Sequence, residues 1–320
     1  MRAAVLDDYQ DVALTLADWR SLAPDVTVER FADHQDDAEA LVRRLAPFDI
    51  VVAMRERTPF PRALIERLPN LRLLVTSGMR NAAIDVAAAA ERGIVISGTD
   101  MLPYPTAELT WGLILALARR LPWEIEATRG GAWQTTLGEG LNGKTLGLLG
   151  LGRLGAQVAA VGRAFGMTLL AWSPNLTPAR AAECGAERVD KAELFARADF
   201  VTIHLVLGPR STGLVGAAEF GAMKPGAYLV NTSRGPIVDE AALVDALRRG
   251  AIAGAALDVF DHEPMAADHP LRGCATALLT PHIGYVTREN YRQVFTQTVE
   301  NIAAFRAGRP IRLLTPPPRT

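Results

Sequence analysis

Short aliphatic and β-branched runs alternate along this chain with longer stretches whose apolar residues recur at helical spacing. In the first third, the runs predict strands at Ala3–Leu6, Val26–Phe31, Ile50–Ala53, Leu73–Thr76 and Ile94–Ser97. Helices are predicted at Asp37–Leu45 and at Pro61–Leu68, where Pro61 suits the first turn because its missing N–H would be unpaired there. Such alternation is typical of parallel sheets with helices on both faces.

A second series of elements follows a strongly apolar helix predicted at Thr106–Arg120 and a helical stretch that ends near Gly130. Its strands are predicted at Thr145–Leu149, Thr168–Trp172, Phe200–His204, Ala227–Asn231, Gly254–Val259 and Ala277–Thr280. Its helices are predicted at Arg153–Phe165 before Gly166, at Glu240–Arg249 between an Asp239 N-cap and Gly250, and from Thr287 to Ala307 before Gly308. The proline tail at 316–318 is expected to lack regular structure.

The composition narrows the classes of partner. Hydrophobic residues make up 49% of the 320 residues, enough for large cores, and this length is typical of two domains. The formal net charge is −1 with both signs interspersed, so no basic stripe for nucleic acid and no polybasic segment for a membrane is present. A small-molecule partner is therefore expected. Cys184 and Cys274 form no CxxC pair, which predicts no disulfide framework, no metal site and a reducing, cytoplasmic setting.

A glycine-rich motif, Gly150-Leu-Gly-Arg-Leu-Gly155, stands between a predicted strand and the start of a predicted helix. There the helix N-terminus offers unpaired N–H groups and a positive dipole end to a dinucleotide pyrophosphate, although the glycines alone would also fit a tight turn. Ser173 stands where the fingerprint expects an acid for the adenosine ribose. The sequence favours NAD(H), because no arginine directly follows Ser173 to attract a 2′-phosphate and the nearest is Arg180. NADP(H) stays a rival, because no carboxylate at this position would repel that phosphate.

Three polar side chains follow strands of this second series: Arg234, Glu263 and His282. Open α/β sheets bind ligands at the carboxyl ends of their strands, so a guanidinium, a carboxylate and an imidazole are expected together at one edge. Each residue alone also has a structural interpretation, as a loop cation, a surface carboxylate or a structural histidine. His34 and His269 lie in polar stretches and are expected to be solvated.

Four segments, taken in order, resemble the D-isomer-specific 2-hydroxyacid dehydrogenase family, and the similarity extends over essentially the whole chain. The segments are Leu146–Gly155, similar to the family's cofactor loop; Met223–Gly235, similar to the segment of its substrate arginine; Ala255–Pro264, similar to that of its acid; and Thr280–Gly284, similar to that of its histidine. The resemblance implies an oxidoreductase that transfers a hydride between NAD(P)(H) and a small D-2-hydroxy acid or 2-oxo acid.

The resemblance also implies roles for individual residues. Arg234 would bind the substrate and Glu263 would pair with His282, and these three form the expected catalytic set. Asp258 would face the nicotinamide carboxamide. The expected cofactor-binding residues are Thr106, Gly150, Gly152, Arg153, Leu154, Gly155, Ser173, Val206, Thr212, Thr232, Ser233, Asp258 and Gly284.

A discontinuous fold is implied by the same family. Residues 1–100 and 288–320 are expected to form a flavodoxin-like substrate domain, and residues 101–287 a Rossmann NAD(P)-binding domain inserted into it. The fold class is then α/β with two doubly wound parallel sheets, and the family places its active site in the cleft. A homodimer formed through the Thr106–Arg120 helix would explain why that helix is so apolar.

Substrate binding is expected from the loop within Thr76–Asp85, which resembles the family's loop for the substrate carboxylate. The expected ligands there are Ser77, Gly78, Met79 and Arg80. Arg80 stands where a second glycine is usual, and arginine adopts positive φ only at a cost. The loop therefore either has another backbone shape or gains a cation.

Arg55 is a further expected substrate ligand. With Arg57, it resembles the stretch that meets the phosphate in phosphoglycerate dehydrogenases, so D-3-phosphoglycerate dehydrogenase is an alternative to a dehydrogenase of unphosphorylated acids. Glu56, which lies between the two arginines, weakens that alternative.

The expected chemistry follows from charge placement. During reduction of a 2-oxo acid, negative charge grows on the carbonyl oxygen, and a protonated His282 would neutralise it. Glu263 would stabilise the imidazolium, and Arg234 would hold the substrate carboxylate with its planar fork. Two other classes stay open: a weakly catalytic NAD(H)-sensing interaction protein, and an α/β binding protein without a redox role.

Overall fold

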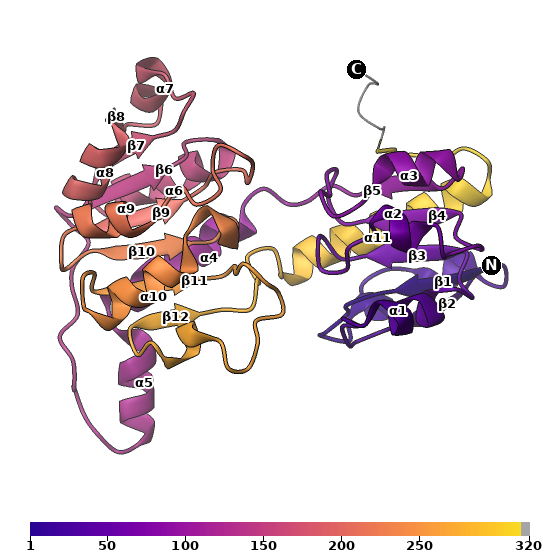
Figure 1. Ribbon diagram of the computed structural model, residues 1–320, viewed down its shortest axis with the longest axis horizontal. Helices are drawn as coiled ribbons and strands as arrows, with labels where there is room; N and C mark the ends of the chain where they lie inside the picture. The colour runs from indigo at the N-terminus through magenta and orange to yellow at the C-terminus, as the bar shows by residue number, and fades with distance from the viewer. Residues whose placement is uncertain (315–320) are drawn as a thin grey trace. The chain divides into compact units, whose positions relative to one another are not determined.

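The computed structural model describes residues 1–314, which form two compact units (Figure 1). Unit 1 contains Met1–Leu102 together with the chain from Val286 onward, and unit 2 contains Pro103–Tyr285. Unit 2 is thus inserted into unit 1 along the sequence. The proline tail expected at 316–318 lies outside the described residues.

Unit 1 is built on a five-stranded sheet whose strand pairs are all parallel. The strands are β1 (Arg2–Val5), β2 (Thr27–Arg30), β3 (Ile50–Ala53), β4 (Leu73–Thr76) and β5 (Val95–Gly98), in the order β2-β1-β3-β4-β5. This is the order of doubly wound, flavodoxin-like sheets. The central strands β3 and β4 are buried at every position, which explains their unbroken aliphatic runs.

The helices of unit 1 begin at recognisable caps. They are α1 (Ala38–Leu45), α2 (Arg62–Ile65), α3 (Val86–Glu91) and α11 (Arg288–Arg306), with 3-10 turns η1 (Ala13–Thr15) and η2 (Trp19–Leu22). The prediction for the second helix was wrong in two respects. Pro61 is the N-cap and not a first-turn residue, and α2 ends early because Arg67 and Leu68 donate to carbonyls only three residues back.

Unit 2 is built on a seven-stranded sheet whose pairs are also all parallel. The strands are β6 (Thr145–Leu149), β7 (Thr168–Trp172), β8 (Glu187–Arg188), β9 (Phe200–Ile203), β10 (Tyr228–Asn231), β11 (Gly254–Leu257) and β12 (Ala277–Leu279), in the order β12-β11-β10-β9-β6-β7-β8. The chain reverses direction across the sheet between β6 and β9, the switch point of a Rossmann fold. The expected class of two doubly wound parallel sheets is confirmed.

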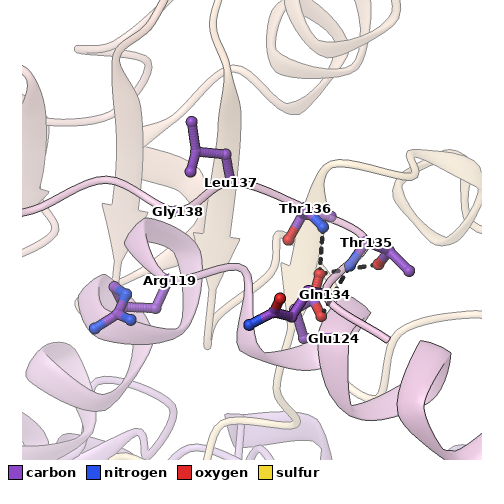
Figure 2. Close-up of a pocket in the computed structure, with 7 residues that line it drawn as sticks. All are labelled: Arg119, Glu124, Gln134, Thr135, Thr136, Leu137 and Gly138. Carbon is purple, nitrogen blue, oxygen red and sulfur yellow. Dashed lines mark hydrogen bonds between the residues drawn. The ribbon is translucent and has the colours of Figure 1, made fainter. Parts of the chain in front are cut away.

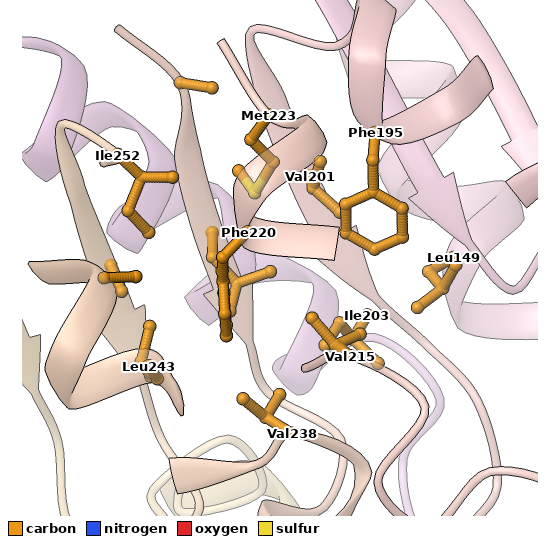
Figure 3. Close-up of a cluster of buried hydrophobic side chains, with 14 of the residues drawn as sticks. Leu149, Phe195, Val201, Ile203, Val215, Phe220, Met223, Val238, Leu243 and Ile252 are labelled. Atoms are coloured by element: carbon orange, nitrogen blue, oxygen red, sulfur yellow. The ribbon is translucent and has the colours of Figure 1, made fainter. Parts of the chain in front are cut away.

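Two apolar cores cover the two faces of this second sheet. The helices are α4 (Pro105–Ala118), α5 (Leu121–Arg129), α6 (Arg153–Ala164), α7 (Pro178–Glu183), α8 (Lys191–Arg197), α9 (Ala217–Ala222) and α10 (Glu240–Arg248), with 3-10 turns η3 (Gly235–Ile237) and η4 (Pro270–Gly273). In one core, Phe195, Phe220 and Leu243 of three different helices pack against strand residues such as Val201 (Figure 3). In the other, α4, α6 and α7 cover the opposite face.

The apolar character of α4 has its cause inside unit 2. Trp111, Leu113, Ile114 and Leu117 are all buried in the core that α4 shares with α6 and the sheet. This burial accounts for the composition, because a helix in contact with a sheet and a second helix needs apolar residues on most of its surface. The homodimer expected through this helix stays a prediction.

Most predicted strands agree with the structure to within one or two residues, whereas several short elements had no predicted counterpart. These elements are α3, α7, β8, α8 and α9, each of two to seven residues. Among residues 1–314, no helix is long and apolar enough to span a bilayer. Cys184 and Cys274 are free thiols, and the cytoplasmic location stays a prediction.

Candidate active site

The carboxyl ends of β10, β11 and β12 lie side by side, because these strands are neighbours in parallel register. The loops that follow them carry Arg234, Glu263 and His282 respectively. Three residues from separate parts of the sequence are thereby placed at one edge of the unit 2 sheet, where parallel α/β sheets bind ligands.

A close backbone contact joins the first two of these loops. A Cβ atom at Gly235 would lie 2.1 Å from the carbonyl carbon of Phe260, so only glycine allows this approach. Asn231 donates through Nδ2 to the Arg234 carbonyl at 2.9 Å, and Arg234 donates through Nη1 to the Ser233 carbonyl at 2.8 Å. The loop of Arg234 is thus held against the segment that leads to Glu263. Sequence reasoning did not assign Gly235 this role, although a glycine directly after Arg234 was the available signal.

Glu263 and His282 form a direct pair. Oε2 of Glu263 lies 2.5 Å from Nδ1 of His282, and the side chains are 28% and 20% exposed. The other carboxylate oxygen accepts from the Phe260 N–H at 2.9 Å, which fixes the orientation of the acid. The imidazole packs edge-on against Tyr285, with ring centroids 5.6 Å apart. Within the described residues, Nε2 of His282 has no hydrogen-bond partner, so it is the ring nitrogen available to a ligand.

Asp258 holds the loop that carries His282. Its carboxylate, in a residue that is only 1% exposed, accepts from the Thr280 hydroxyl at 2.7 Å and from the N–H groups of Ile283 and Gly284, both at 2.8 Å. Burial raises the pKa of Asp258 above its usual range. His282 itself has φ of +52°, a left-handed conformation that a non-glycine residue adopts only when its surroundings impose it. The expected contact of Asp258 with nicotinamide stays a prediction.

The glycine loop has a shape that fits a pyrophosphate. Gly150 has φ of +106°, and a Cβ at Gly155 would lie 2.2 Å from the Gly150 carbonyl oxygen, so both positions need glycine. Gly152 is the N-cap of α6 with no side-chain cap, and a Cβ there would meet nothing within 4 Å. The N–H groups that follow, at Arg153 and Leu154, lie in the first turn of α6 and have no side-chain cap, which suits an anion.

Other expected cofactor residues line the same edge of unit 2. Thr106 donates to the Gly284 carbonyl at 3.1 Å, and Thr232 lies 2.8 Å from the Thr110 hydroxyl. Val206, just after β9, is 84% exposed. The remaining contacts are those of Ser233 with the Leu205 carbonyl and of Thr212 with the Gly208 carbonyl. The expected contacts of these residues with the dinucleotide stay predictions.

In unit 1, the loop after β4 is braced by Arg55. The backbone N–H of Arg55 donates to the Ser77 hydroxyl at 2.8 Å, and its Nη1 donates to the Ser77 carbonyl at 3.3 Å. A Cβ at Gly78, which has φ of +91°, would lie 2.3 Å from the Arg55 guanidinium. Arg80 does not adopt a positive φ, and both Met79 and Arg80 are exposed. The loop therefore accommodates arginine at position 80 without strain and presents it to solvent.

Two histidines differ from their predicted solvated state. Nδ1 of His34 lies 2.8 Å from the buried Asp7 carboxylate, and only 11% of the side chain is exposed; the hydrogen bond to Asp7 raises the pKa of His34. His269 lies 3.1 Å from Glu240 and is 22% exposed. Both predictions failed because a polar stretch of sequence does not reveal a carboxylate supplied by a distant segment.

A hollow also lies at the opposite, amino edge of unit 2 (Figure 2). Glu124 of α5 accepts from the N–H groups and one hydroxyl of Thr135 and Thr136, which folds the following segment back along the helix. The lining residues are Arg119, Glu124, Gln134, Thr135, Thr136, Leu137 and Gly138. None of the expected catalytic residues lies here.

Comparison with known proteins places the chain in a family. The sequence profile described as "D-isomer specific 2-hydroxyacid dehydrogenase, NAD binding domain" matches residues 111–284. The chain belongs to the D-isomer specific 2-hydroxyacid dehydrogenase family. Within this family it is 41% identical over 256 residues to a glyoxylate reductase of Aeropyrum pernix, covering 77% of this chain and 76% of that protein.

Two further proteins of similar sequence are a longer enzyme and a solved structure. A D-3-phosphoglycerate dehydrogenase of Methanocaldococcus jannaschii is 38% identical over 268 residues, which cover 82% of this chain but 51% of that longer protein. A crystal structure of phosphoglycerate oxidoreductase from Vibrio cholerae superposes with a TM-score of 0.91 at 37% identity, covering 96% of this chain and 99% of that one. As a member of the family, this D-2-hydroxyacid dehydrogenase is an enzyme whose cofactor is NAD(H).

The role of Asp258 in this dehydrogenase is testable by Asp258→Asn. The amide cannot accept all three hydrogen bonds, so the loop should lose the imposed conformation at His282. We expect kcat to fall by about 10- to 100-fold, the usual consequence of a displaced catalytic group. Steady-state kinetics on the purified variant measures this, with NADH binding followed separately.

Thr280→Val is the matched control, because it removes one donor to the same carboxylate and leaves both backbone N–H groups in place. It should reduce kcat less than Asp258→Asn does. An Asp258→Asn enzyme with unchanged kcat would show that the carboxylate does not hold the loop.

Proposed function

We propose that this enzyme reduces a small 2-oxo acid to the D-2-hydroxy acid, and catalyses the reverse reaction, through Arg234, Glu263 and His282. The observation that carries the proposal is the 2.5 Å contact between Glu263 and His282, in a loop beside that of Arg234 at the carboxyl edge of the unit 2 sheet. An acid–imidazole pair with one ring nitrogen available is the arrangement that general acid–base catalysis requires.

Each residue then has a defined task. When bound, NADH supplies the hydride that reaches C2 of the substrate. His282, protonated, gives the proton on Nε2 to the carbonyl oxygen as negative charge develops there. Glu263 accepts from Nδ1 and stabilises the imidazolium. Arg234 holds the substrate carboxylate with two parallel N–H donors, which fixes the face that C2 presents.

We propose an unphosphorylated substrate of the size of glyoxylate or hydroxypyruvate. In unit 1, the Arg57 guanidinium donates to the Asp7 carbonyl at 2.9 Å and stacks on the Tyr9 ring, and that of Arg55 bonds to Ser77 and Glu56. Both arginines are therefore already engaged by the protein, which favours a substrate without a phosphate.

In unit 2, the glycine loop would hold the dinucleotide. In unit 1, the loop of Ser77, Gly78, Met79 and Arg80, which Arg55 braces, would hold an anionic group of an organic acid. D-3-phosphoglycerate dehydrogenase stays an alternative because the stretch of Arg55 and Arg57 resembles the one that meets the phosphate in those enzymes. The partner is in either case a small organic acid.

We also propose a homodimer, formed through α5 and the segment that follows it. Its exposed apolar residues are Leu121 (44%), Ile125 (50%), Trp133 (78%) and Leu137 (92%), and no residue of α5 is buried. The segment is anchored at the amino edge of the sheet by Trp123, which donates to the Ala275 carbonyl at 3.1 Å. Large apolar side chains gathered on one projecting segment mark an association surface.

The proposed activity is tested by assaying glyoxylate, hydroxypyruvate and phosphohydroxypyruvate with NADH. We expect turnover with at least one of the first two, and His282→Ala should lose about 100-fold or more in kcat while it binds NADH normally. Tight NADH binding by the wild-type protein without turnover of any 2-oxo acid would instead indicate a cofactor-sensing protein. Near-normal turnover of His282→Ala would rule out its role as the acid.

The dependence of the rate on pH tests the pairing of Glu263 with His282. Reduction needs the imidazolium, so its rate should fall as pH rises, whereas oxidation should improve over the same range. In Glu263→Gln the carboxylate charge that stabilises the imidazolium is lost. The pH at which the rate of reduction falls should therefore be lower than in the wild type. His34→Gln, which breaks a histidine–carboxylate pair in unit 1, is the matched control and should leave that pH unchanged.

The dimer is tested by sedimentation of the Trp133→Ser/Leu137→Ser double variant. We expect the wild-type protein to sediment as a dimer and the variant as a monomer at low micromolar concentration, because both side chains are among the most exposed apolar groups described. Leu14→Ser, an exposed leucine in unit 1, is the control and should remain dimeric. A monomeric wild-type protein, or a double variant that stays dimeric, would contradict the proposed interface.

A further inference from the structure

The turn that follows β7 has the donors of a phosphate site. It spans Ser173–Leu176 and is closed by a hydrogen bond from the Leu176 N–H to the Ser173 carbonyl at 3.2 Å. The Trp172 carbonyl just before it accepts from the Gly150 N–H at 2.8 Å, so the turn adjoins the glycine loop. In a Rossmann fold this turn meets the ribose of the adenosine, where a carboxylate selects NAD and a nearby arginine accommodates a 2′-phosphate.

No carboxylate belongs to this turn. Its sequence is Ser-Pro-Asn-Leu, followed by Thr177, which caps α7. Within residues 1–314, the hydroxyl of Ser173 and the side-chain amide of Asn175 have no hydrogen-bond partner, and Asn175 is exposed. A hydroxyl and an amide N–H₂ are both donors to phosphate oxygens. The turn therefore offers neutral donors where a carboxylate would repel an added phosphate.

The structure also brings an arginine to this turn. β8 pairs in parallel with β7, with Arg188 opposite Ala171. The Arg188 side chain reaches the turn and donates through Nε to the Leu176 carbonyl at 2.9 Å. Its two terminal N–H₂ groups have no partner among the described residues. By contrast, Arg180, nearest in sequence, donates to Glu183 at 3.0 Å. One hydrogen bond thus holds the Arg188 guanidinium at this turn, and its two terminal N–H₂ groups can donate to a ligand.

We propose that Arg188, with Ser173 and Asn175, recognises the 2′-phosphate of NADP(H), so that NADP(H) is a cofactor of this enzyme in addition to NAD(H). The inference rests on the dinucleotide site of the proposed function and adds the residue that selects the phosphorylated form. A guanidinium–phosphate contact is charge-assisted and corresponds to a gain of about tenfold or more in affinity. NADH lacks the phosphate and gains nothing from Arg188.

The test is binding, measured apart from catalysis. Dissociation constants for NADPH and NADH are obtained by calorimetry, and adenosine 2′,5′-bisphosphate is compared with AMP to isolate the adenosine end. Wild type should bind both dinucleotides. Arg188→Gln should raise the dissociation constants of NADPH and the bisphosphate by about tenfold or more. The dissociation constants of NADH and AMP should change by less than about twofold.

Two further variants make the result decisive. Ser173→Asp places a carboxylate in the turn and should lower the affinity for NADPH by a larger factor than the affinity for NADH. Arg180→Gln removes an arginine already paired with Glu183 and should change neither constant. Failure of the wild type to bind NADPH, or equal weakening of both dinucleotides by Arg188→Gln, would overturn the inference while NADH binding and turnover still supported the proposed function. Failure to bind either dinucleotide would overturn both.

Discussion

Parallel pairing in the unit 2 sheet is the constraint on which the site depends. Because β10, β11 and β12 are neighbours and run the same way, the loops of Arg234, Glu263 and His282 leave the sheet at one edge. The same geometry places the glycine loop after β6 at that edge. A reaction that needs a cofactor, an anion-binding group and a proton donor requires several chain segments at one place, and parallel strands supply them without long loops.

Fixing those loops takes buried polar groups, which cost free energy unless they are bonded. Asp258 meets this requirement with three donors from the segment 280–284, and the bonds give His282 a backbone conformation that it would rarely adopt alone. The close approach of Gly235 to Phe260 does the same for the loop of Arg234. The rigid parts of the site are thus backbone contacts and one buried carboxylate.

Two histidines at this edge of the sheet, His204 and His282, have different hydrogen-bond partners and therefore different roles. Burial lowers the pKa of His204 to about 4, and its described side-chain partner is the Thr202 hydroxyl at 3.0 Å, so it stays neutral beneath the glycine loop. A Cβ at Gly150 would lie 2.6 Å from the His204 carbonyl oxygen, which makes this residue part of the support for that loop. His282, bonded to a carboxylate instead, can carry the positive charge that proton donation requires.

The sequence alone determined most of the strands, the glycine motif and the order of the family's motifs. These features are local, since buried parallel strands read as aliphatic runs and glycine positions mark tight turns. Tertiary structure alone decided what distant segments do to one another. It buried α4 in the core of unit 2, paired His34 with Asp7, and brought Arg188 to the carbonyl of Leu176, 12 residues earlier in the chain. None of these contacts leaves a periodic signal, because each depends on how strands pair across the sheet rather than on neighbours in sequence.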